Sequence, residues 1–231
     1  MKDKFKSIGA GSLVILLYFI TMLYPTLPFK LLNVDFTSMP TFLKVTYAIS
    51  LDIVLLFLIY LVFKKDLIKD FKDFKKNNLN YFKKYLKIWL YGLIAMYFCN
   101  LIMTIINNGN LPGNEEGVRN LLTQMPFYMF ISAVVLGPTI EELIFRKGIR
   151  KILFFNDKLF IIFAGLIFGN LHVVGNINSW IDLLYIIPYS SLGVAFAYMY
   201  VKSKNIFVPI MFHTIHNGLL VSLQILLSLF V

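Results

Sequence analysis

The sequence contains little charge. Only 15% of its 231 residues are charged, whereas 58% are hydrophobic and the mean hydropathy is +0.75. Because soluble domains average about a quarter charged residues, a water-soluble globule and a disordered chain are both excluded. A helix that spans a bilayer needs roughly 20 apolar residues, and the chain has room for about seven. We therefore expect an all-α polytopic membrane protein, a transmembrane bundle of about seven helices (six to eight).

Cysteine and acidic residues are also scarce. The single cysteine, Cys99, excludes an intramolecular disulfide and any cysteine-based metal site. Twelve acidic residues stand against 22 basic ones, which gives a net charge of +10. The basic residues lie between apolar runs rather than among exposed aromatic side chains. We therefore expect membrane lipids as partners and no nucleic acid.

Seven apolar runs predict the transmembrane helices. Their approximate bounds are 8–29, 45–63, 86–106, 124–154, 159–175, 181–201 and 206–231. The last run contains Asn217 followed by Gly218, so it forms either one helix or two. The first run is long and lacks a small-residue cleavage site, so it is expected to remain in the protein as a helix. The segment 107–123 reads as a plain outer loop.

The basic residues predict the orientation. Nineteen of the 22 fall in four segments, at 1–7, 64–87, 146–158 and 202–205. With a cytoplasmic N-terminus these segments all face the cytoplasm, as the positive-inside rule requires. Lysine outnumbers arginine 19 to 3, which is typical of an AT-rich bacterium. The expected location is therefore a bacterial plasma membrane.

The chain divides into two regions. Residues 1–110 hold the N-terminal transmembrane helices, and within them 64–87 is a basic segment with apolar residues at helical spacing. This pattern predicts an amphipathic helix at the cytoplasmic interface, with its aromatic residues toward the membrane; the alternative is a solvated linker. Residues 120–231 form the second bundle, which carries the candidate site.

Ionisable side chains inside spans are costly and are candidates for function. Asp182 lies at a helix end, and Asp52 serves equally well as a packing residue. The others gather in three runs of the second bundle, at Glu141, Glu142, Arg146, His172, His213 and His216.

Helical spacing predicts which of these residues share a helix face. Glu142 and Arg146 lie four residues apart and can form an ion pair, whereas Glu141 points about 100° away. His213 and Asn217 lie one turn apart on the last span. Counted at 1.5 Å per residue, Glu141, His172, His213 and Asn217 can reach a common depth.

Two kinds of chemistry suit this set. A carboxylate and a histidine can deprotonate a water molecule, while a second histidine and an amide donate hydrogen bonds to an oxyanion. Alternatively, Glu141, His172 and His213 form a zinc-type ligand set with an open position for water. Both lead to hydrolysis of a peptide bond, and no His-Glu-x-x-His motif is present.

The three motifs Glu-Glu-x-x-x-Arg (141–146), Phe-x-x-x-His (168–172) and His-x-x-x-Asn (213–217) resemble those of the CPBP family, the CAAX proteases and bacteriocin-processing enzymes also called Abi proteins. The resemblance covers residues 120–225 and implies an intramembrane endopeptidase.

By this resemblance, Glu141 and His172 activate the attacking water, and His213 and Asn217 stabilise the oxyanion. Glu142 and Arg146 would support the site as a structural pair. The resemblance leaves metal dependence open: a mechanism without a cofactor is favoured, and Zn²⁺ is the alternative. His216 lies outside the motifs and is expected to pack beside the site.

The expected substrates are membrane-associated peptides or proteins, such as pheromone, bacteriocin or lipidated precursors. Another reading is a non-catalytic membrane scaffold, or a bacteriocin-immunity protein, that regulates a membrane partner. A proton-coupled transporter is a third reading, but no inverted repeat supports it.

Overall fold

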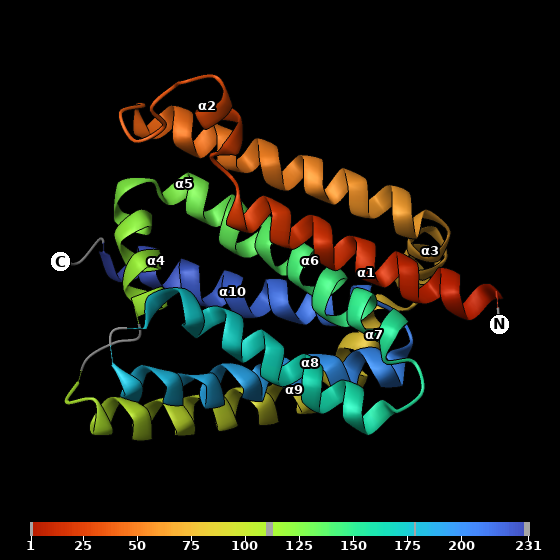
Figure 1. Ribbon diagram of the computed structural model, residues 1–231. Coiled ribbons are helices and arrows are strands. Elements are labelled where there is room, and N and C mark those ends of the chain that lie inside the picture. The colour runs from red at the N-terminus through yellow and green to blue at the C-terminus, as the bar shows by residue number, and fades with distance from the viewer. Residues whose placement is uncertain (1, 110–112, 178, 229–231) are drawn as a thin grey trace.

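The computed structural model describes residues 2–109, 113–177 and 179–228, and these form helices without any strand, which confirms the all-α bundle (Figure 1). The α-helices are α1 (Lys2–Leu23), α2 (Leu27–Leu31), α3 (Thr41–Ile106), α4 (Gly113–Gln124), α5 (Pro126–Met129), α6 (Gly137–Glu142), α7 (Ile149–Ile152), α8 (Asp157–Val173), α9 (Ile186–Ser203) and α10 (Phe207–Ser228). Two π-helical stretches, η1 (Phe130–Leu136) and η2 (Leu143–Gly148), and two 3₁₀ turns, η3 (Val174–Asn176) and η4 (Trp180–Tyr185), connect them.

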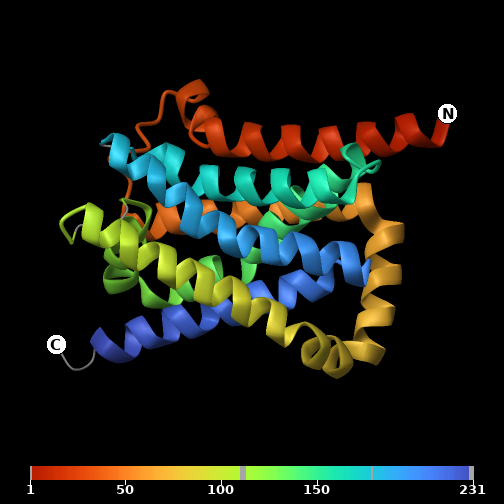
Figure 2. The same cartoon turned by 90° about the horizontal axis from the view of Figure 1, so that it is seen from below.

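Five helical stretches are long and apolar enough to span a membrane, and they support a membrane protein. They cover Asp3–Leu23, Thr41–Ile106, Pro126–Ile152, Trp180–Ser203 and Phe207–Leu227. The second stretch, α3, is 66 residues long and turns back on itself, so two arms run along the bundle (Figure 2). With α8 lying along α9 (Figure 1), seven helical segments run along the bundle, as expected.

The continuity of α3 differs from the prediction of two helices joined by a separate segment. Residues 41–91 contain no glycine and no proline, so nothing in the backbone interrupts the helix where the sequence becomes polar. The last apolar run forms one helix, α10, rather than two. The predicted outer loop was wrong in part, because α4 covers residues 113–124.

The four basic segments lie together. The start of α1, the part of α3 that carries Lys65–Lys76, the α7–α8 connection and the α9–α10 connection all lie at one end of the bundle (Figure 2). We call it the basic end. The start of α1 and the end of α10 lie at opposite ends (Figure 1).

The amphipathic part of α3 is helical, as predicted, and its apolar face packs on protein only in part: Leu67 is buried, whereas the Phe71 side chain is 52% exposed. The rings of Phe71 and Phe74 lie 5.4 and 5.9 Å from the ring of Phe207 at the start of α10. Tyr85, farther along α3, is buried. The sequence pattern identifies this apolar face, but it does not tell whether lipid or another helix lies against it.

Ion pairs fasten the same segment to the bundle. Lys147 of η2 is 2% exposed, and its Nζ lies 2.9 Å from Asp70 Oδ2. Lys151 of α7 pairs with Asp66 at 2.6 Å. Asn205 donates a hydrogen bond of 2.8 Å to the Asp70 carbonyl. These contacts hold the crossing part of α3 against the stretch that carries the acidic pair.

Candidate active site

The acidic pair lies in a helix of irregular pitch. Pro138 follows η1 at the start of α6 and has no N–H to donate to the preceding turn. A second π-helical stretch, η2, begins directly after Glu142. Such wide turns are frequent at functional sites. Here they flank the short helix that carries both glutamates.

Glu142 and Arg146 form a fully buried ion pair. Glu142 Oε1 lies 3.1 Å from Arg146 Nη1, and both side chains are 0% exposed. Arg146 Nη2 donates a hydrogen bond of 3.0 Å to the carbonyl of Gly193 on α9. Its guanidinium group also lies over the ring of Phe168, 4.5 Å from the centroid. The pair therefore joins the acidic helix to α8 and α9.

His213 lies between the two glutamates. Its Nδ1 is 2.9 Å from Glu142 Oε1, and its Nε2 is 3.8 Å from Glu141 Oε2. The imidazole stacks on Phe196, with 4.9 Å between the centroids. The last span thus supplies a histidine whose two nitrogens face different carboxylates.

His172 is held in one orientation. Its Nδ1 lies 2.8 Å from the carbonyl oxygen of Phe168, and because a carbonyl only accepts, Nδ1 must carry the proton. In the neutral ring Nε2 is then the free acceptor, as a general base requires. The ring stacks on Tyr189 at 4.8 Å and lies 4.4 Å from the ring of Phe168.

Asn217 is partly buried and donates a hydrogen bond to the backbone of another helical stretch. Its Nδ2 donates a hydrogen bond of 2.8 Å to the carbonyl of Ala133 in η1. An amide nitrogen has two hydrogens, so one remains for another acceptor. This bond holds α10 against the stretch that precedes the acidic helix.

The structure brings four of the predicted residues into direct contact: Glu141, Glu142, Arg146 and His213. His172 joins them through Phe168, whose ring also lies 5.5 Å from that of His213. Asn217 follows one turn later on α10 and makes its contact with η1.

Two buried oxygens of this cluster are unsatisfied within the described part of the chain. Glu141 Oε2 and Glu142 Oε2 have no hydrogen-bond partner there. A buried acceptor without a partner is costly, and at an active site it is available to water or substrate.

The zinc-type ligand set does not assemble. Across the described ranges, no group of three His, Cys, Asp or Glu side chains is arranged to hold a metal ion. Nδ1 of His172 contacts a carbonyl and Nδ1 of His213 contacts Glu142, so each ring has only its Nε2 to offer to a metal. The arrangement of these residues does not fit Zn²⁺, and we derive no step through a metal.

The other polar residues of the predicted spans are His216, Asp52 and Asp182. His216 is buried and 5% exposed. Asp52 is partly buried in the first arm of α3. Asp182 accepts a hydrogen bond of 2.7 Å from the Ser179 backbone and caps η4, as its position at a helix end predicts.

Sequence reasoning missed two features of the site. It did not predict that Glu142 reaches His213 as well as Arg146. It also gave Phe168 no role, although this ring contacts both histidines and the arginine. Phe168 lies four residues before His172, one helical turn, and this spacing was the available signal.

Comparison with known proteins agrees with the motifs. Residues 123–219 match the family described as Type II CAAX prenyl endopeptidase Rce1-like. The putative membrane peptidase YdiL of Bacillus subtilis is 34% identical over 116 residues, which cover 48% of this chain and 43% of that protein. The membrane-embedded CAAX protease MroQ of Staphylococcus aureus is 30% identical over 150 residues, 62% of this chain and 60% of that protein.

A third relative, the UPF0177 protein YvdC of Lactococcus lactis, is 25% identical over 205 residues, 84% of this chain and 76% of that protein. No solved structure matches significantly. The chain spans about half the length of the first two relatives. The family match includes all three motifs and confirms the resemblance that they suggested.

Proposed function

We propose that this protein is an intramembrane endopeptidase that acts on membrane-associated peptides or proteins, because residues 123–219 match the family of Type II CAAX prenyl endopeptidase Rce1-like proteins and carry the three CPBP-like motifs. The observation that carries the proposal is the placement of His213 between Glu141 and Glu142, at 3.8 and 2.9 Å. The protein would work in a bacterial plasma membrane with its basic end toward the cytoplasm.

Glu141 and His172 activate the attacking water. Glu141 has a buried oxygen without a hydrogen-bond partner within the described residues, and His172 has its Nε2 free. A water between them loses a proton to Glu141, and the hydroxide attacks the carbonyl carbon of the scissile bond. The same proton then passes to the amide nitrogen as the C–N bond breaks, which leaves an acid and an amine.

His213 and Asn217 stabilise the oxyanion. His213 contacts Glu142 through Nδ1 and faces Glu141 with Nε2. An imidazolium donates from both nitrogens: Nδ1–H to Glu142, and Nε2–H toward the oxyanion. The second hydrogen on Asn217 Nδ2 is the other donor. Glu142 therefore positions His213 as well as pairing with Arg146.

The direct test compares peptides released by cells that express the wild type or Glu141→Ala at matched protein levels. Glu115→Ala is the control, because Glu115 forms only an exposed pair with Arg119 in α4. We expect specific products to vanish with Glu141→Ala alone. If Glu141→Ala releases the same peptides as the wild type while a deletion has a phenotype, the proposal fails and a non-catalytic scaffold is the better account.

A further inference from the structure

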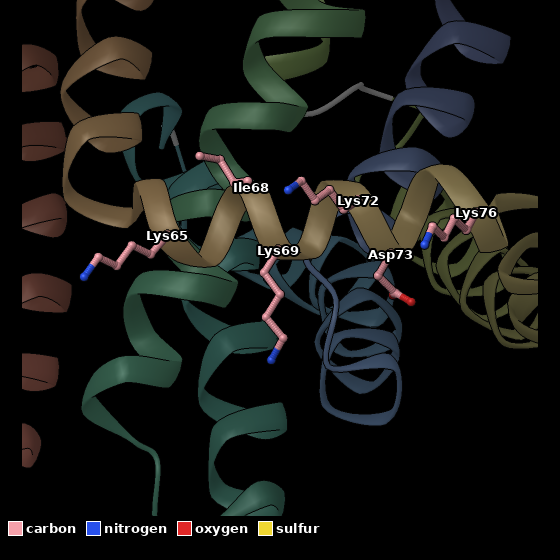
Figure 3. A pocket seen from close by; sticks show the side chains of 6 residues that line it. All are labelled: Lys65, Ile68, Lys69, Lys72, Asp73 and Lys76. Carbon is pink, nitrogen blue, oxygen red and sulfur yellow. The ribbon is translucent and has the colours of Figure 1, made fainter.

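The crossing part of α3 presents a row of lysines. Lys65, Lys69, Lys72 and Lys76 recur at intervals of four, three and four residues, so they share one helix face. Figure 3 shows these side chains along the segment, with Ile68 and Lys72 on one edge. They line a groove of about 510 Å³, open at the basic end. All four are exposed.

The acidic residues of this segment neutralise the row only in part. Asp73 lines the same groove as the four lysines, which leaves its lining with three net positive charges, and the other two acidic residues have lysine partners elsewhere. Asp70 pairs with Lys147 and Asp66 with Lys151, at 2.9 and 2.6 Å. Asp73 accepts a hydrogen bond of 2.6 Å from the Tyr81 hydroxyl. Among the described residues, no ion pair includes any of the four lysines of the row.

A second, apolar groove adjoins the first. It has a volume of about 360 Å³, and Ile68 and Lys72 line both grooves. Its other walls come from the first arm of α3, from Thr139 and Leu143 around the acidic pair, and from the start of α10. A cationic groove therefore opens beside an apolar groove that lies along the bundle.

We propose that the two grooves together bind one anionic phospholipid of the cytoplasmic leaflet. Its phosphate lies among Lys65, Lys69 and Lys72, and an acyl chain lies in the apolar groove. Charge complementarity selects an anionic headgroup, because basic grooves on this side of a membrane attract such lipids. The apolar groove selects a lipid over a free phosphate, because only a lipid has a chain to fill it.

The test measures which lipid stays with the protein. The full-length protein is exchanged into detergent, incubated with vesicles of equal parts phosphatidylglycerol and phosphatidylcholine, and purified again, and the bound lipids are quantified. We expect at least fivefold enrichment of phosphatidylglycerol on the wild type. The variant Lys65→Gln/Lys69→Gln/Lys72→Gln should bring this ratio close to one.

The matched control is Lys83→Gln/Lys87→Gln/Lys158→Gln. It removes the same charge from exposed lysines that line neither groove, and it should keep the enrichment. Equal loss in both triple variants would overturn the proposal in favour of diffuse surface charge. Displacement of the lipid by millimolar inorganic phosphate would overturn it in favour of a free anion.

A second variant tests whether the apolar groove binds the acyl chain of the lipid. Leu56→Trp fills the apolar groove from α3 without changing charge, and it should lower bound phosphatidylglycerol at least threefold while the lysine row remains intact. Unchanged binding would overturn the placement of the chain. If the lysine variant fails to fold, as judged by gel filtration, this substitution still decides the proposal.

Discussion

Glu142 Oε1 lies 2.9 Å from Nδ1 of His213, so the second glutamate of the acidic pair contacts the last span directly. The same oxygen lies 3.1 Å from Arg146 Nη1. One buried carboxylate oxygen thus contacts both Arg146 and His213, which come from different parts of the bundle. It links the candidate oxyanion donor to the arginine that joins α8 and α9.

The first prediction concerns this carboxylate. Glu142→Gln removes the carboxylate that is paired with the buried Arg146, and loss of one partner from a buried pair costs about 3–5 kcal/mol. We expect a clear drop in melting temperature together with loss of activity. Arg119→Gln, which breaks the exposed pair with Glu115, should change stability by less than about 1 kcal/mol. Equal melting temperatures for Glu142→Gln and the wild type would contradict this reading.

How far the sequence predicts this site depends on the kind of contact. The Glu142–Arg146 pair follows from spacing within one helix, and it is present. Contacts between helices do not follow from spacing, because they depend on rotation and tilt. Counting residues at 1.5 Å allowed His213 to meet the glutamates, but it could not tell which glutamate each nitrogen faces.

The fold likewise has features that follow from local sequence and features that depend on how the helices pack. Apolar runs predicted seven segments along the bundle and a basic end, because each depends on local composition. The continuous α3 and the packing of Phe71 and Phe74 on Phe207 depend on where the chain turns. An amphipathic pattern has the same form whether lipid or protein covers it.

The second prediction separates the oxyanion donors from the base. His213→Ala and Asn217→Ala should each lower kcat by about 10²–10³-fold, as for the loss of one oxyanion donor, with KM little changed. The substrate is whatever peptide the release experiment identifies. Ser222→Ala, an exposed position on the same helix, is the control. A large rise in KM with normal kcat would assign both residues to substrate binding instead.

The third prediction concerns metal. Within the described residues Glu141, His172 and His213 are not arranged as a group that could hold a metal ion, so EDTA treatment of the purified protein should leave activity within about twofold. Elemental analysis should give well under one zinc per chain. Loss of activity with EDTA and its recovery with added zinc would require the site to rearrange around a metal.

The fourth prediction tests the ion pair that fastens α3. Asp70→Asn removes the closer partner of the buried Lys147, at 2.9 Å, and leaves it only Asp66 at 3.9 Å, and breaking a buried ion pair is strongly destabilising. Adding Lys147→Met removes that charge and supplies an apolar side chain, so the double variant should be more stable than Asp70→Asn. Melting temperatures of the four proteins form a double-mutant cycle. Strictly additive effects would mean that the pair contributes no coupling.

The fifth prediction concerns the contact between α8 and α9, which carries His172. A Cβ on Gly169 would overlap with Ser190 Oγ and would lie 2.5 Å from the carbonyl oxygen of Ile186. Because that carbonyl is backbone and cannot yield as a side chain would, Gly169→Ala must push the helices apart. We expect little folded protein in gel filtration of the purified variant. Gly9→Ala has open space around its Cβ and should behave as the wild type; a well-folded, active Gly169→Ala would contradict the close packing.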